Sequence, residues 1–310
     1  MNNNGKQPRP RVRNILLATD FSAFSETALY YAGAIARHSG ATVHLVHVIV
    51  PEAWQYFCAE TTPIPFEQLR EGAERQMNYF LQSEALTGVH HRAWIEEGPV
   101  WDALEAIIQN QHIDLLVVGT HGRTGLKKLL LGSAAEEIIR LSPAPVLAVG
   151  PQAERHRASS VREILYATDF TAESLAALPF ALDQTHNYGA HLSLLHVVPE
   201  PSRKSLPDPA RVTACLRDKL EALIPSEAAN GHEPSCIVKI GEPAELILAT
   251  AQEIPADMIV LGVHASGALP GHSLGSTVYK VICEAPCPVL TAAGDARQTV
   301  LKEHLVAHAS

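Results

Sequence analysis

The feature that most constrains how this chain folds is an internal repeat. The segment from Asn14 to Ser22, which reads NILLATDFS, returns as EILYATDFT from Glu163 to Thr171, 149 positions further along. A chain of 310 residues is also long enough for two α/β cores of about 150 residues each. Self-similarity at this period therefore predicts two copies of one domain.

Later landmarks of the two copies keep a common spacing as well. His47 and Val48 recur at the same offset as His196 and Val197. Five further pairs are 143 apart: Gly98 with Gly241, Asp114 with Asp257, Gly119 with Gly262, Gly132 with Gly275, and Pro145 with Pro288. The second copy therefore lacks six residues in its middle.

These matches divide the chain into four parts. The first domain spans residues 11–150 and the second spans 162–293. Between them, residues 151–161 are polar and lack periodic apolar residues, which predicts a linker. Residues 294–310 form a tail with no assigned role.

Within each copy, short apolar runs alternate with segments of helical period, a pattern typical of βαβ units and a parallel sheet. In copy one we expect strands near 13–19, 42–49, 90–96, 113–118 and 145–149, and helices near 23–39, 65–86, 99–111 and 132–142. Ser22 is placed to cap the first helix and Gly40 to end it. The fold class is thus α/β, with two tandem Rossmann-like domains, each a five-stranded parallel sheet with helices on both faces.

Composition excludes several classes of function. The formal net charge is -9, so the protein lacks the positive field with which nucleic-acid binders attract phosphates. The same charge disfavours binding to an anionic membrane surface. No apolar run approaches the roughly 20 residues needed to span a bilayer, and the first run is too short for a signal peptide. The five cysteines form no C-x-x-C pair, which fits a reducing cytoplasm.

Two segments fall at carboxyl ends of expected strands, where ligands of open parallel sheets bind. In the first, Ala18, Thr19 and Asp20, the carboxylate is placed to accept hydrogen bonds from a sugar hydroxyl or a base amine. The alternative is that Asp20 only helps to start the helix at Ser22.

The second segment runs from Val118 to Ala134. Glycines at positions 119, 122 and 132 allow close approach of backbone to a ligand, and Gly132 and Ser133 open a helix whose free N–H groups favour an anion. Positive charge is added by Arg123, Lys127 and Lys128. These features suit a polyphosphate, the alternative being a glycine-containing loop with a solvated basic face.

The spacing of Gly119, Gly122, Gly132 and Ser133 resembles the glycine pattern of ATP-binding universal stress proteins, and the resemblance extends over nearly the whole chain in two copies. It implies ATP with Mg²⁺ or Mn²⁺ as ligand, the ion resting on the phosphates and not on protein groups. The implied nucleotide-binding residues are Ala18, Thr19, Asp20, Val48, Val118, Gly119, Gly122, Arg123, Gly132, Ser133 and Ala134.

Copy two departs from this pattern. Ala265 replaces the middle glycine, Ser266 stands in place of Arg123, and Pro270 and Gly271 replace the two lysines. We expect weak or absent ATP binding there. The residues that remain as a candidate second site are Asp169, Val197, Gly262, Gly275 and Ser276.

Three other sequence features give weaker evidence about function. Residues 271–275 match the G-x-S-x-G nucleophile elbow of hydrolases, but Pro270 precedes them and the strand ends near Leu261, so a hydrolase acting through Ser273 is a remote alternative. The sixteen histidines show no metal-ligand spacing, and His47 and His196 are expected to pack beside the crevice. Trp54, Tyr56 and Phe57 are candidates to cap the pocket, with ordinary packing as the alternative.

The resulting hypothesis is a cytoplasmic ATP-binding regulatory protein of the stress response that is not an enzyme, because no general base accompanies the phosphate loop and at most slow hydrolysis is expected. The alternative of another class is a nucleotide-free tandem interaction or scaffold module. The resemblance also implies that the last strands, around Val146 and Val289, pair in an internal pseudo-dimer, with a homodimer of chains left open.

Overall fold

The computed structural model describes residues 12–50, 65–121, 131–200, 209–224, 233–263 and 274–293. The first half contains β1 (Asn14–Ala18), α1 (Ala23–Ser39), β2 (Thr42–Ile49), α3 (Phe66–Leu81), the 3-10 helix η1 (Glu84–Leu86), β3 (His91–Glu97), α4 (Val100–Asn110), β4 (Leu115–Gly119), α5 (Ser133–Leu141) and β5 (Val146–Val149). The second contains β6 (Glu163–Ala167), α6 (Ala172–Tyr188), β7 (His191–Val198), α8 (Pro209–Glu221), β8 (Ser235–Ile240), α9 (Pro243–Glu253), β9 (Met258–Val263), α10 (Ser276–Glu284) and β10 (Val289–Ala293). The predicted α/β class with five strands in each copy is confirmed.

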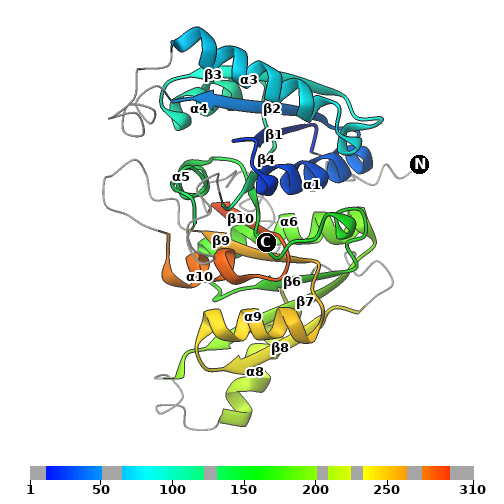
Figure 1. Ribbon diagram of the computed structural model, residues 1–310. Helices are drawn as coiled ribbons and strands as arrows, with labels where there is room; N and C mark the ends of the chain where they lie inside the picture. The colour runs from blue at the N-terminus through cyan, green and yellow to red at the C-terminus, as the bar shows by residue number, and fades with distance from the viewer. Residues whose placement is uncertain are drawn as a thin grey trace, which may run out of the picture.

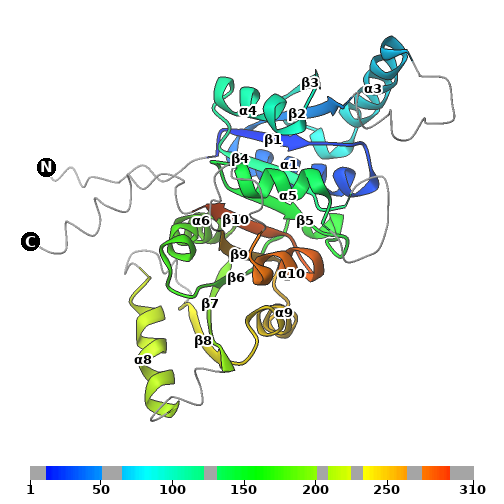
Figure 2. The ribbon, with the colours of Figure 1, turned by 90° about the vertical axis from the view of Figure 1, so that its left-hand side faces the viewer.

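The ten strands of the described residues belong to one sheet, in the order β3-β2-β1-β4-β5-β10-β9-β6-β7-β8. Neighbours within each half are parallel, whereas β5 and β10 pair antiparallel, with Val146 opposite Thr291 and Leu147 opposite Leu290. Figure 1 shows the halves one above the other, and Figure 2 labels β5 and β10 between them. The predicted pairing of the two last strands is therefore confirmed.

Two apolar layers cover the two faces of this sheet. Successive residues of β1 alternate between them, Ile15 and Leu17 facing one layer and Leu16 the other. The first layer takes residues from α1, α3, α6 and α8, and the second from α4, α5, α9 and α10. Because each layer contains residues of both halves, the core is continuous across the join, where Figure 2 places α5 next to α10.

The ends of α1 follow from its sequence. The Ser22 side chain accepts a hydrogen bond from Ser25 N, and Gly40 ends the helix at φ 73°, in the left-handed region that glycine adopts without strain. The second copy repeats this with Thr171 and with Gly189 at φ 63°. Both predicted caps of α1 are confirmed.

The expectation of one helix over 65–86 is wrong, because α3 ends at Leu81 and Ser83 begins the separate turn η1. The turn packs against α1, where a Cβ on Gly33 would lie 2.0 Å from Ala85 O. Arg37 Nη1 also donates to Ala85 O at 2.7 Å. A straight continuation of α3 would lose these contacts with α1.

The segment 151–161 contacts both halves. It contains the 3-10 helix η2 (Arg155–Arg157), in which Arg155 donates to both carboxylate oxygens of Glu26 at 3.0 and 2.8 Å. Arg157 forms an ion pair of 3.3 Å with Asp257, whose side chain is 7% exposed. This segment therefore fixes α1 of the first half to the start of β9 in the second.

Cys287 lies buried near that ion pair. Burial raises the pKa of its thiol to about 12, and the Asp257 carboxylate acts in the same direction while Arg157 opposes it. The folded protein thus holds this proton more tightly than the unfolded chain, where the ordinary value is 9.0. The stability linked to this group is present below pH 9 and is lost as the pH rises through 12.

We expect the free energy of unfolding to fall above pH 9, with Cys287 contributing about 1.4 kcal/mol per pH unit. The test is urea unfolding between pH 8 and 11. In Cys287→Ala the decline is expected to be shallower from pH 9 upward, whereas the exposed control Cys215→Ala keeps the wild-type slope. Equal slopes in all three proteins would contradict this assignment.

Among the residues that the structure describes, no helix combines the length and apolar character needed to cross a membrane.

Candidate functional site

A cavity of about 260 Å³ opens at the carboxyl ends of the first half's strands. The chain runs outward from β1 to β2 and β3 and then returns to add β4 on the other side of β1. The loops after β1 and β4 therefore leave in opposite directions, which creates a crevice between them. Nine predicted site residues line this cavity: Ala18, Thr19, Asp20, Val48, Val118, Gly119, Gly132, Ser133 and Ala134. The other two, Gly122 and Arg123, lie outside the described residues, as do Trp54, Tyr56 and Phe57.

The turn after β1 is fixed by hydrogen bonds to Thr19. Its N–H donates to Val46 O at 2.9 Å, and its hydroxyl accepts from Phe21 N at 3.0 Å. Phe21 takes φ 61°, a conformation that is uncommon for a residue with a side chain. The turn thus holds Asp20 at the cavity wall.

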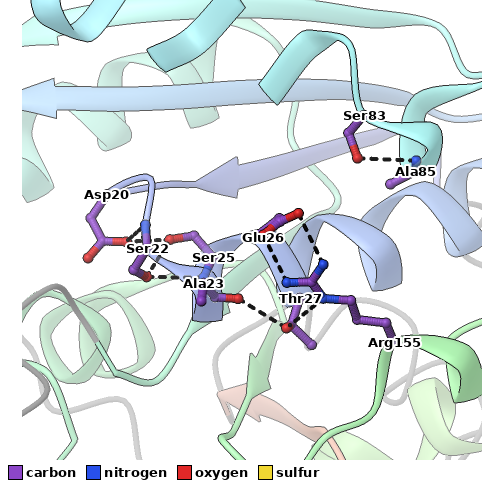
Figure 3. A network of polar contacts seen from close by, with 9 residues as sticks. All are labelled: Asp20, Ser22, Ala23, Ser25, Glu26, Thr27, Ser83, Ala85 and Arg155. Carbon is purple, nitrogen blue, oxygen red and sulfur yellow. Dashed lines mark hydrogen bonds and ion pairs between the residues drawn. The ribbon is translucent and has the colours of Figure 1, made fainter. Parts of the chain in front are cut away.

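Asp20 also organises the first turn of α1, as Figure 3 shows. Its Oδ1 accepts from Ser22 N at 3.0 Å and from the Ser25 hydroxyl. The two interpretations of Asp20 in the sequence are therefore compatible, because the same side chain orders the helix start and lines the cavity. A preordered carboxylate loses little conformational entropy when a ligand binds.

His47 is a lining residue that the sequence placed only beside the crevice. Its Nδ1 lies 2.8 Å from Thr19 O, and its ring packs on Phe21 with centroids 4.3 Å apart. Because a carbonyl oxygen can only accept, Nδ1 carries a proton in this contact. The second copy repeats the arrangement with His196, Thr168 O and Phe170.

The opposite wall is the amino end of α5. Gly132 is the N-cap residue, held by a hydrogen bond of 2.8 Å from its N–H to Thr120 O. The first N–H groups of an α-helix have no intrahelical acceptor, and they carry the positive end of the helix dipole. Ser133 and Ala134 are exposed at this end and line the cavity, which makes it suited to an anion.

Apolar side chains form the floor between these two polar walls. Sequence reasoning missed this part of the lining, which consists of Val46, Val100, Leu104 and Ile138, together with Ser25, His121 and Ala135. Val100 and Leu104 are one turn apart on α4, a spacing that marks them as one face of a helix. Their spacing does not indicate that this face meets the strand carrying Val46.

Gly119 lines the cavity, and helix packing gives a second reason for a glycine there. A Cβ at this position would lie 3.0 Å from Phe24 C and Ser25 N, which are backbone atoms of α1. At Gly262 the overlap is more severe, with Glu173 O at 2.2 Å and Ser174 Cα at 2.3 Å. These glycines allow a helix to approach a strand, so their presence follows from packing and does not by itself indicate a ligand.

The second half repeats the turn that follows the first strand. Asp169 Oδ1 accepts from Thr171 N at 3.0 Å and Thr171 Oγ1 at 2.6 Å. Burial raises the pKa of Asp169, but these hydrogen bonds outweigh it and bring the pKa below its ordinary value. Gly275 and Ser276 open α10 as Gly132 and Ser133 open α5. Ala265, Ser266 and Ser273 lie outside the described residues, so a ligand role for this copy stays a prediction.

A Ser–His–carboxylate arrangement occurs elsewhere in the second half. His191 Nδ1 contacts Glu163 Oε2 at 2.9 Å, and His191 Nε2 lies 3.3 Å from Ser235 Oγ. The same Nε2 lies 3.1 Å from Glu233 O, a contact in which it must donate. The group joins the amino ends of β6, β7 and β8, opposite the edge where ligands bind, and we interpret it as an anchor for the edge strand.

No group of three or more His, Cys, Asp or Glu residues is arranged to hold a metal ion in the part of the chain that the structure describes.

Known proteins resemble the whole chain. A family model described as the universal stress protein family matches residues 11–150 and again 160–292. A universal stress protein of Mycolicibacterium smegmatis is 26% identical over 288 residues, which is 89% of this chain and 95% of the relative; one of Mycobacterium tuberculosis is 24% identical over 309 residues, 90% of this chain and 94% of the relative. The crystal structure of a universal stress protein from Archaeoglobus fulgidus has a TM-score of 0.70 at 25% identity, with 91% of this chain and 98% of that chain covered.

Proposed function

Because the chain belongs to the universal stress protein family and contains two tandem copies of its domain, we propose that its first half binds ATP and that the bound nucleotide regulates the protein in a stress response. The observation that carries this proposal is the single cavity that joins Asp20, an apolar floor and the amino end of α5. These three features supply what a nucleoside triphosphate needs.

Each part of the ligand has a matching wall. The apolar side chains of Val46, Leu104 and Ile138 suit the flat adenine ring. Asp20 accepts hydrogen bonds from hydroxyl or amine groups, and the N–H groups of the first turn of α5 face the phosphates. Mg²⁺ or Mn²⁺ bound to the phosphates would neutralise part of their charge.

We also propose that hydrolysis, if it occurs, is slow. The titratable residues that line the cavity are Asp20, His47 and His121. Asp20 accepts from Ser22 and Ser25, His47 donates to Thr19 O, and His121 Nδ1 lies 2.9 Å from Thr120 Oγ1. These groups are engaged in ordering the site, which leaves them poorly suited to activate a water at the γ-phosphate.

Isothermal titration of ATP with MgCl₂ into protein that has been stripped of bound nucleotide tests the proposal. We expect one site per chain, because only the first half combines Asp20 with the complete glycine and charge pattern. Adenosine should bind the same site more weakly, since it cannot reach the amino end of α5. Two equal sites would contradict the assignment to one half.

A nucleotide-free interaction module is the second candidate, and the continuous ten-stranded sheet favours it, because it presents two similar halves as one rigid surface. The same titration separates the two functions. No heat and no thermal shift with ATP in the stripped protein would support the module.

A further inference from the structure

The second half contacts the start of the helix that we assign to phosphate binding. Leu131, directly before the N-cap Gly132, is 7% exposed. Its N–H donates to the hydroxyl of Tyr279, which lies on α10, with 3.4 Å between Leu131 N and Tyr279 Oη. The amino end of α5 is therefore held by a side chain that lies 148 residues further along the chain.

Cys283, one turn beyond Tyr279 on α10, takes part in the same contact. Burial raises the pKa of its thiol, while hydrogen bonds from the Leu131 backbone and the Tyr279 side chain oppose that rise. Three polar groups thus converge behind the start of α5, and Leu131 packs there in the same apolar layer as Val281.

The equivalent positions with the two halves exchanged carry residues of different chemistry. The repeat offset places Glu136 and Arg140 of α5 at the positions of Tyr279 and Cys283, and Leu274 at the position of Leu131. A glutamate carboxylate could accept from a backbone N–H as the phenol does, but it carries a charge that a phenol lacks and cannot also donate to a neighbouring thiol. The half with the complete glycine pattern receives the tyrosine, whereas the half with the incomplete pattern supplies it.

We propose that Tyr279 is a positioning residue for the ligand site of the first half, so that the second half acts as part of that site. The identity of the ligand rests on the proposed function, but the positioning of α5 does not. Gly132 is held on one side by Thr120 O, at 2.8 Å, and through Leu131 on the other by Tyr279. Together these bonds set the direction in which the N–H groups of residues 133–135 point.

The first test needs no nucleotide. In ligand-free Tyr279→Phe, amide hydrogen exchange in peptides covering residues 131–136 is expected to be about fivefold faster than in the wild type, because one hydrogen bond to the helix start is lost. Exchange in β6 and β7 should stay unchanged. The matched control is Tyr79→Phe, whose ring is 68% exposed on α3. Unchanged exchange at 131–136 would overturn the proposal.

The second test separates positioning from a general loss of stability. We expect Tyr279→Phe to weaken ATP binding about fivefold, while adenosine affinity changes less than about twofold. Equal weakening of both ligands would overturn the proposal, because a positioning residue at α5 acts on the phosphates. A wild-type protein that binds no ATP would refute the proposed function alone, and the exchange experiment would still decide the role of Tyr279.

Discussion

Ser133→Asp is expected to weaken ATP binding about 100-fold, whereas Ser276→Asp at the equivalent position of the second half should leave it unchanged. Ser133 is exposed and lines the cavity at the first residue of α5. A carboxylate there meets the phosphate charge at about 5 Å, where two like unit charges repel by about 3 kcal/mol at an effective dielectric constant near 20. Each 1.4 kcal/mol lost is a tenfold loss of affinity.

The same substitution should not harm the fold. An acidic residue in the first turn of a helix interacts favourably with the helix dipole, by about 0.3 to 1 kcal/mol. Thermal unfolding of Ser133→Asp without ligand is therefore expected at or slightly above the wild-type temperature. Reduced affinity in a variant of unchanged stability would be assigned to the site itself.

Two control variants complete this experiment, and the same ATP titration measures the affinity of all three proteins. Ser133→Asn adds nearly the volume of aspartate without its charge and should cost less than about fivefold in affinity. Ser276→Asp places the charge at the start of α10. If Ser276→Asp weakens binding as much as Ser133→Asp does, ATP does not bind in the first half alone.

The second large effect concerns stability. Gly262→Ala is expected to lower the free energy of unfolding by about 3 kcal/mol, the upper end of the range for added atoms in a packed core. The new Cβ would lie 2.2 Å from Glu173 O and 2.4 Å from Glu173 C. Backbone atoms of α6 must then move away from β9, and neither the helix nor the strand has a flexible side chain there to yield.

Urea unfolding measures this change, and Gly275→Ala is the control. Among the described residues no atom lies within 4 Å of a Cβ at Gly275, and its φ of -54° is open to alanine, so the change should stay within about 1 kcal/mol. Gly119→Ala, with its nearest contacts at 3.0 Å, is expected to fall between the two. A Gly262→Ala protein as stable as the wild type would show that α6 does not require this glycine.

The sequence was sufficient for most of the elements because their signals are local, although it missed the break between α3 and η1. Apolar runs between turn residues predicted the strands, and Ser22 and Gly40 marked the ends of α1. The repeat then predicted that the second half would follow the first. The pairing of β5 with β10 was implied by the family resemblance, and the need of an apolar edge strand for a partner agrees with it.

The residues of the cavity floor could not be predicted from local sequence signals. Leu104 and Val46 are far apart in the sequence, and they meet only because α4 crosses the face of β2 in the finished sheet. The packing role of Gly119 could not be predicted for the same reason. Its partner is the backbone of α1 at Phe24, and a contact between two backbones leaves no trace in the residue types on the other side.

The antiparallel join of β5 and β10 has a consequence for how the two copies diverge. If the copies were separate chains, their random association would give a mixture of like and unlike pairs, and a change in one copy would be diluted among them. Here the partner strand is encoded in the same polypeptide. Every molecule therefore contains one half with Gly122 and Arg123 and one with Ala265 and Ser266, in a ratio that does not depend on concentration or expression.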